Sequence, residues 1–225
     1  MKKKTTLLIR LIVFILLLFI PFTTFADPFI RGPVIPIFFA FSKTFKPTTV
    51  PGGLLLQTDS RFCSAINSNG CCFFSLMGAV QLFFQCPLNA DQINEIYNYC
   101  TSNPSTLDPS VDIIVPNCWI KDPNSILKET LTEILGTNPP VQGIWSTTKP
   151  ADNDWDFCLV NFISANHWVL ADKNAHFKDP QNSMDQTNIN IIYNPAGAGN
   201  DTIPTDQVTT SNCQINYLTF KLLPQ

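Results

Sequence analysis

Histidine is scarce in this 225-residue sequence, and so is the residue spacing that metal sites commonly use. The chain contains two histidines, His167 and His176, and none of its eight cysteines belongs to a Cys-x-x-Cys pair. Structural zinc sites typically combine such pairs with closely spaced histidines. We therefore expect no metal site, and nothing in the sequence predicts a bound cofactor.

Charged residues are also few, and basic residues are outnumbered. Only 14% of the residues are charged, with 14 Lys and Arg against 17 Asp and Glu. Four of the basic residues lie within the first 26 positions, so the rest of the chain carries a net charge of about −7. A surface that follows the phosphates of a nucleic acid is rich in Lys and Arg. We therefore expect no nucleic-acid partner.

Apolar runs of the kind found in signal or membrane-spanning segments are missing from most of the chain, and the exception lies at its start. Three lysines precede an apolar segment at 11–21, and small residues follow up to Ala26. This pattern is typical of a bacterial signal peptide. We predict a signal peptide at 1–26 and a secreted or periplasmic protein, with an uncleaved anchor as the alternative. No later stretch is long and apolar enough to span a bilayer, so we expect no membrane span after signal removal.

Proline separates the signal region from the rest of the chain. Residues 27–53 contain five prolines and many phenylalanines. Proline fixes φ and removes a backbone donor, so this segment cannot form a long helix. We predict a Pro/Phe-rich N-terminal arm at 27–53 and one compact domain at 54–225, a length that suits a single core.

Helical patterns dominate the first half of this domain, and strand patterns dominate the second half. Apolar spacing and capping residues predict helices at 71–84, 89–100 and 123–135. Alternating or short apolar runs predict strands at 54–59, 111–115, 157–163, 167–172, 188–193 and 214–221. This order predicts an α+β fold in which the central helix packs on an antiparallel sheet.

The start of the central helix holds the strongest candidate for a nucleophile. A polar turn ending in Asn69 and Gly70 changes abruptly into an apolar run, which places Cys71 at the first helical turn. Unpaired N–H groups and the helix dipole favour a thiolate there. We therefore predict Cys71 as a catalytic nucleophile. The alternative is that Cys71 or Cys72 is half of a disulfide, because secreted cysteines are usually paired.

The sequence offers only two candidates for a general base, because it contains two histidines. His167 begins an apolar strand, which positions a side chain more rigidly than the polar loop around His176. Asn194 follows a strand that can lie beside the His167 strand, and an amide there would hold the imidazole in place. Asp179 is the competing residue for this orienting role.

Gln57 is a candidate oxyanion donor. It lies 14 residues before Cys71 and follows a short apolar run. A glutamine shortly upstream of a cysteine nucleophile can supply a side-chain N–H to a developing oxyanion. An ordinary surface amide is the alternative.

Several segments together resemble a known family. In the first half they are a Gln-x-Asp-x-Arg-aromatic segment at 57–62, a Gly-Cys pair at 70–71 and a small residue followed by Leu-Met at 75–77. In the second half they are a His-Trp-Val-Leu block at 167–170 and a strand ending in Asn-Pro within 191–197. In this order they resemble papain-like cysteine peptidases of the double-glycine-leader (bacteriocin-processing) type and their exported relatives. The resemblance covers about 54–199 and implies a papain-like fold with a Cys71, His167 and Asn194 triad and Gln57 at the oxyanion.

Four features depart from the family pattern. Cys72 stands where the family usually has a small residue, and Asn194 stands where it usually has aspartate. The additional cysteines are unusual. The spacing of 27 positions between His167 and Asn194 is long, so the stretch holding His176 and Asp179 would be an insertion.

The resemblance and the residue chemistry predict an exported cysteine peptidase acting on a peptide or protein substrate, cell-wall peptides included. The alternative is an inactive, disulfide-stapled binding domain at the cell surface. We expect Cys86 and Cys100 to form a disulfide, since they flank one short helix. A free Cys71 leaves seven other cysteines, so one more must also be unpaired, and we expect it to be Cys158 in a buried strand.

Overall fold

The structure is a computed structural model that describes residues 50, 52–151, 154–173, 175, 188–197, 202–204 and 207–224. The chain divides into two units, Met1–Phe38 and Phe39–Gln225, and all described residues lie in the second unit. The predicted signal peptide at 1–26 and most of the predicted arm at 27–53 lie outside the described residues. His176 and Asp179 also lie outside them.

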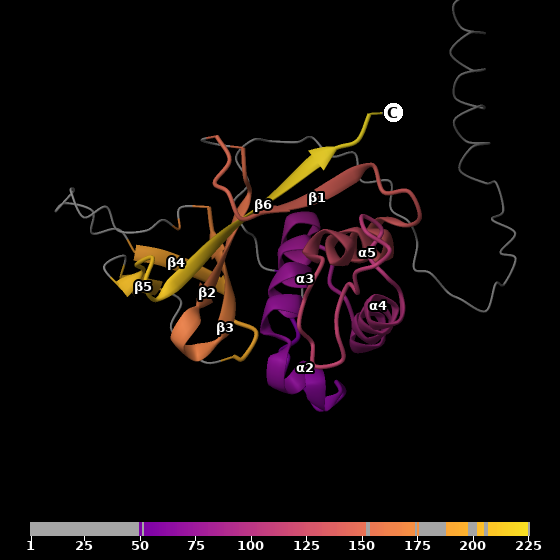
Figure 1. The fold of residues 1–225 in the computed structure, drawn as a ribbon, viewed down its shortest axis with the longest axis horizontal. Helices are drawn as coiled ribbons and strands as arrows, with labels where there is room; N and C mark the ends of the chain where they lie inside the picture. Colours follow the sequence, from indigo (N-terminus) through magenta and orange to yellow (C-terminus); the bar gives the residue numbers. More distant parts are fainter. Residues whose placement is uncertain are drawn as a thin grey trace, which may run out of the picture. The chain divides into compact units, whose positions relative to one another are not determined.

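Helices occupy the first half of the described chain, as predicted (Figure 1). They are α2 (Ser64–Asn69), α3 (Cys71–Phe84), α4 (Ala90–Ser102) and α5 (Pro123–Leu135). Twelve of the 14 residues of α3 are buried, which explains its nearly continuous apolar sequence. The sequence analysis missed α2, because this short helix buries only Ile66 and carries no apolar stripe.

Two helix starts have the caps that the sequence predicts. At α4, the Asn89 side chain accepts from the Gln92 N–H, and the Gln92 side chain accepts from the Asn89 N–H in return. At α5, Asp122 accepts from the first N–H groups and Pro123 occupies the first helical position. These caps satisfy donors that would otherwise lack partners at the helix ends.

Strands occupy the second half and form an antiparallel sheet. They are β1 (Val141–Ser146), β2 (Phe157–Phe162), β3 (His167–Asp172), β4 (Asn188–Tyr193), β5 (Thr202–Pro204) and β6 (Cys213–Leu222), arranged in the order β1-β6-β2-β3-β4-β5. The α+β class is therefore confirmed. The sequence analysis missed β1, where Gln142 and Gly143 interrupt the apolar alternation.

Two predicted strands are wrong. Residues 54–56 belong to no strand, and a turn follows in which the Asp59 N–H donates to the Leu56 carbonyl. Residues 111–115 form isolated bridges rather than a ladder. Tight turns on both sides limit this second segment, and Cys118 has a left-handed φ of 64° in the turn that follows it.

The sheet buries both of its faces in different cores. Residues on one face of the sheet pack in the same core as α3: Phe157, Leu159, Leu170, Leu218 and Phe220. Alternate residues on the same strands form a second core on the other face: Cys158, Val160, Val169, Ala171 and Ile215. Because α3 lies along the first face and contacts β3, its first turn lies beside the start of that strand.

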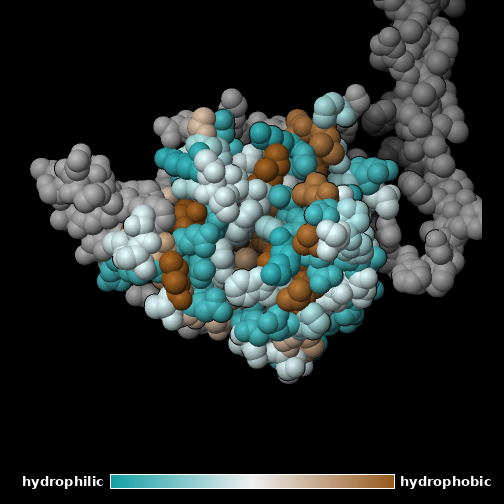
Figure 2. Space-filling view, viewed as in Figure 1, coloured by the Kyte–Doolittle hydropathy of each residue, from teal (hydrophilic) through white to brown (hydrophobic). Residues whose placement is uncertain are grey.

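The surface carries no dominant apolar patch on the side shown in Figure 2. Hydrophobic residues of the described chain occur there singly or in small groups among hydrophilic ones, as is usual for protein surfaces. Among the helices that the structure describes, none has the length and apolarity needed to cross a membrane.

Removal of the α5 cap tests the local stability of the helical half. Asp122 is buried, accepts from the N–H groups of Asn124 and Ser125, and also accepts from the hydroxyls of Ser105 and Ser125. Asp122→Ala therefore removes a cap and leaves buried donors unpaired. We expect it to lower the free energy of unfolding by about 2 kcal/mol in urea denaturation.

The exposed Glu95 on α4 provides a control for this measurement. Glu95→Ala should change the free energy of unfolding by less than about 0.5 kcal/mol. Equal effects of the two substitutions would contradict the structural role assigned to Asp122.

Candidate active site

Gly70 allows two helices to meet directly before Cys71. A Cβ on Gly70 would lie 2.5 Å from the Ile66 carbonyl oxygen, which is too close for any other residue. Gly70 also caps α3 without a side-chain hydrogen bond, so the first N–H groups of the helix have no side-chain partner from the cap. Cys71 is the first residue of α3, as predicted, and only 6% of its surface is exposed.

The turn between β2 and β3 brings His167 to this helix end. Asn166 has a left-handed conformation with φ of 46°, and it ends a short 3-10 helix at Ile163–Ala165. Asparagine tolerates this conformation better than most residues. The Cys71 thiol lies 3.8 Å from the Asn166 carbonyl oxygen, which follows from this turn.

Asn194 holds the imidazole of His167 from the neighbouring strand. The His167 Nε2 atom lies 2.9 Å from Asn194 Oδ1, and β3 pairs with β4 as predicted. The Ala196 N–H donates to the same Oδ1 atom at 3.1 Å, which identifies this atom as the amide oxygen. In the neutral ring, Nε2 must therefore carry the proton, which leaves the lone pair on Nδ1.

The Cys71 and His167 side chains favour opposite charges on each other. Burial raises the pKa of the Cys71 thiol, but hydrogen bonds from His167 and from the Trp168 and Cys72 N–H groups bring the pKa below its ordinary value. The hydrogen bond with Cys71 raises the pKa of His167, burial opposes this rise, and Asn194 adds to it. Both directions favour a thiolate–imidazolium pair.

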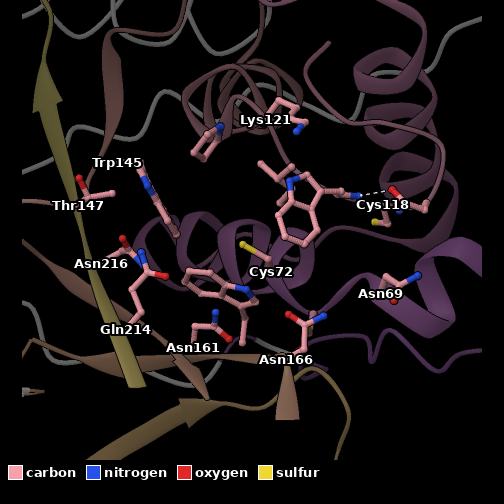
Figure 3. A pocket seen from close by; sticks show the side chains of 16 residues that line it. Asn69, Cys72, Cys118, Lys121, Trp145, Thr147, Asn161, Asn166, Gln214 and Asn216 are labelled. Atoms are coloured by element: carbon pink, nitrogen blue, oxygen red, sulfur yellow. Dashed lines mark hydrogen bonds between the residues drawn. The ribbon is translucent and has the colours of Figure 1, made fainter. Parts of the chain in front are cut away.

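Cys72 has the opposite electrostatic environment. Burial raises the pKa of its thiol well above the ordinary value, and the nearby Cys71 and Cys118 thiols add to the rise. The Cys72 sulfur points into the pocket shown in Figure 3. His167 lowers the pKa of Cys71 while burial raises the pKa of Cys72, so Cys71 has the greater thiolate character of the two adjacent cysteines.

Gln57 lies in a network close to this site. Its backbone N–H donates to the Pro195 carbonyl at 3.0 Å, and its Nε2 donates to the Asn67 carbonyl at 3.1 Å. The side chain is buried, and its Oε1 atom has no hydrogen-bond partner. The described contacts of Gln57 connect α2 with the loop after Asn194, and its predicted role at an oxyanion stays a prediction.

The other residues of the Gln-x-Asp-x-Arg-aromatic segment support this network. Asp59 accepts from the Arg61 backbone N–H and guanidinium, which fixes the turn. Phe62 packs edge-on against Phe74 of α3, with ring centroids 5.0 Å apart. Asn67 donates its side-chain amide to the Gln57 and Asp59 carbonyls. The segment therefore anchors Gln57 to the helix that carries Cys71.

A pocket of about 570 Å³ opens beside Cys71 (Figure 3). Its lining combines aromatic, amide and thiol side chains: Asn69, Cys71, Cys72, Asn117, Cys118, Trp119, Ile120, Lys121, Pro123, Trp145, Thr147, Asn161, Asn166, Trp168, Gln214 and Asn216. No sequence pattern predicts this pocket, because its walls come from the ends of α2, α3 and α5, the 117–121 loop and four strands with their adjoining turns. Most of the lining residues lie far from one another in the sequence, and apart from Cys71 and Trp168 they belong to none of the family-like segments described above.

All eight cysteines are free thiols in this structure. The predicted bond between Cys86 and Cys100 is therefore not formed in it, and this pairing stays a prediction. Cys158 is buried in β2, as predicted, and its thiol lies 3.7 Å from the Ala175 carbonyl. Within the described ranges, no cluster of three or more His, Cys, Asp or Glu side chains is arranged to hold a metal ion.

No protein-family model, curated protein or solved structure matches this chain. The family resemblance therefore rests on the sequence segments alone. Cys71 begins α3, His167 begins β3 and Asn194 directly follows β4, and the structure brings these three positions together, which the spacing of the sequence alone does not require.

The pH dependence of thiol alkylation tests the assigned thiolate–imidazolium pair. Only the thiolate reacts, so the labelling rate of Cys71 by iodoacetamide rises with pH through the pKa of this thiol. We expect the midpoint in the wild type to lie below the ordinary thiol value. In His167→Ala, burial dominates and the midpoint should move to higher pH, which lowers the rate near neutral pH. Mass spectrometry of the labelled peptide separates Cys71 from the exposed Cys63.

Cys63 is the internal control for this labelling experiment. Exposed Cys63 should be labelled equally in the wild type and in His167→Ala, because no contact in the described part of the chain connects it with the imidazole. An unchanged Cys71 profile in His167→Ala would contradict the assigned pair.

Close packing of α3 against β4 gives a second test of the site. A Cβ on Gly78 would lie 2.7 Å from the Tyr193 ring, and the Tyr193 hydroxyl donates to the Leu55 carbonyl at 2.6 Å. Gly78→Ala therefore forces the end of β4, which precedes Asn194, to move. We expect a loss of about 1–3 kcal/mol in the free energy of unfolding and slower labelling of Cys71.

Ser102→Ala at the exposed end of α4 is the control for this substitution. It should change neither the stability nor the labelling rate appreciably. Wild-type stability and wild-type labelling in Gly78→Ala would show that the contact with Tyr193 does not constrain the site.

Proposed function

We propose that this protein is an exported cysteine peptidase with a papain-like fold. The observation that carries the proposal is the hydrogen bond between His167 Nε2 and Asn194 Oδ1, in which the Ala196 N–H fixes the amide oxygen. This bond presents the Nδ1 lone pair to the Cys71 thiol. A Cys-His-Asn arrangement of this kind is sufficient for acyl transfer.

The proposed reaction proceeds in two stages. His167 Nδ1 accepts the proton of Cys71, and the thiolate attacks the carbonyl carbon of a peptide bond. The tetrahedral intermediate collapses as the imidazolium gives its proton to the leaving amine, which leaves an acyl group on the sulfur. Water then attacks the thioester with His167 as base, and the product acid and the free thiol are released.

The oxyanion would form at the start of α3. The Cys71 N–H is one of the unpaired donors of the first helical turn, and the helix dipole favours negative charge there. Gln57 Nε2 uses one hydrogen on the Asn67 carbonyl and has a second hydrogen for the oxyanion. The bond from the Gln57 N–H to Pro195 couples this donor to the loop that carries Asn194.

The arrangement of elements agrees with the proposed fold. A buried helix carries Cys71 at its first turn, and an antiparallel sheet packed on this helix carries His167 and Asn194. The family-like segments lie in the same order along the chain. The signal-like sequence at 1–26 supports export to the periplasm or the medium, where peptides, proteins and cell-wall peptides are available as substrates.

Variants of the proposed triad test the activity on a fluorogenic peptide library and on a cell-wall digest. Cys71→Ala should abolish hydrolysis. His167→Ala should lower kcat/KM by about 10²–10⁴-fold, because it removes the base. Asn194→Ala should cost less, on the order of 10²-fold, because it loosens the ring rather than removing it.

Two further variants are matched controls. Cys72→Ser should retain most of the activity, because the Cys72 thiol has a raised pKa and no contact with His167 in the described structure. His176→Ala should have little effect, since no role is assigned to that residue. Activity that survives in Cys71→Ala and disappears in Cys72→Ser would move the nucleophile by one residue. A wild type without activity and without a reactive thiol would instead favour an inactive binding domain.

A further inference from the structure

The sheet face that packs against α3 is apolar under the helix and becomes polar beyond the first turn of that helix. Leu159 on β2 and Leu218 on β6 lie under α3 in the apolar core. Two residues further on the same face, β2 carries Asn161 and β6 carries Asn216, with Gln214 beyond it. All three amides line the pocket beside Cys71 (Figure 3).

Asn216 is a buried amide without partners. None of its surface is exposed, and neither its Nδ2 nor its Oδ1 atom has a hydrogen-bond partner. The Oδ1 atom of neighbouring Asn161 also lacks one. Buried polar groups are almost always hydrogen-bonded, and leaving a donor and an acceptor unpaired is unfavourable. Such a side chain facing a pocket indicates a ligand that supplies both an acceptor and a donor.

The remaining walls disfavour a cation and suit a planar group. Trp145 and Trp168 lie with ring centroids 5.5 Å apart and planes tilted by 50°. No lining residue is an acid, and the one cation of the lining, Lys121, lies 5.9 Å from the Trp119 ring centroid. A cationic ligand would therefore find no counter-charge among these walls. Indole faces instead suit stacking with a flat group.

We propose that Asn161, Asn216 and the two tryptophans Trp145 and Trp168 form a subsite for a carboxamide, namely the side chain of Gln or Asn in the peptide substrate. This inference rests on the proposed peptidase function, since Cys71 lies in the wall of the same pocket. A carboxamide presents a donor and an acceptor in one plane, which matches the donor and acceptor of Asn216. Gln214, which is exposed on the same strand face, is the first of the three amides that the substrate meets.

Other side-chain classes satisfy the walls less well. A carboxylate only accepts and an ammonium only donates, so each leaves one atom of Asn216 unpaired. An aliphatic side chain leaves both atoms unpaired. A site built to hydrogen-bond a group rejects analogues that lack it. A sugar hydroxyl both donates and accepts but is not planar, and it forms a separate arm of the test.

The test is a binding measurement with Cys71→Ala, which cannot turn over. End-blocked tripeptides with Gln, Glu, Leu or N-acetylglucosaminyl-Ser at the central position are titrated, and the fluorescence of the pocket tryptophans reports binding. We expect the Gln peptide to bind at least about tenfold more tightly than each of the other three. In Asn216→Leu, combined with Cys71→Ala, this preference should fall to about twofold or less.

Asn98→Leu on the exposed face of α4 is the matched control and should keep the preference. Thermal unfolding of Asn216→Leu verifies its fold, and we expect its stability to be unchanged or higher, because a buried unpaired amide is removed. Equal affinities for all four peptides, no binding of any peptide, or a preference that survives Asn216→Leu would overturn the subsite. Tighter binding of the sugar-bearing peptide would also overturn it. Selective binding of the Gln peptide without turnover by the wild type would support the subsite and contradict the proposed peptidase instead.

Discussion

The hydrogen bond between His167 and Asn194 determines what the thiol of Cys71 can do. The Ala196 N–H identifies Asn194 Oδ1 as an acceptor, so the imidazole must donate to it through Nε2. The lone pair of Nδ1 is then available to Cys71. Without this bond the ring could rotate or exchange tautomers, and the proposed reactivity of the thiol would be reduced.

The rest of the domain keeps these three side chains in register. Helix α3 is buried on nearly all sides, which fixes the position of Cys71 at its first turn. The ring of Tyr193 contacts this helix at Gly78, which has no side chain, and its hydroxyl bonds to the segment before Gln57. Gln57 in turn bonds to Pro195, directly after Asn194. The helix, the strand end and the upstream segment are therefore connected by short contacts, so a displacement of one is transmitted to the site.

Local patterns in the sequence predicted the parts of the molecule that local physics determines. The start of α3 at Cys71 and the caps at Asn89 and Asp122 follow from turn and capping chemistry within a few residues. Segment 54–59 has the apolar pattern of a strand, but it forms hydrogen bonds to residues remote in the sequence instead of joining the sheet. Its own residues do not indicate these remote partners. The pocket was missed for the same reason, since a residue such as Asn216 looks like an ordinary polar position of a strand until the strands and α3 are assembled.

The protonation of the His167 ring tests this account most directly. ¹⁵N NMR of Cys71→Ala reports which ring nitrogen carries the proton when the imidazole is neutral, and His176→Gln in the same protein leaves a single histidine to assign. We expect the neutral ring to carry its proton on Nε2. When Asn194 is changed to Ala, we expect a mixture of the two tautomers instead. A ring protonated at Nδ1, or a tautomer that does not respond to Asn194→Ala, would contradict this account.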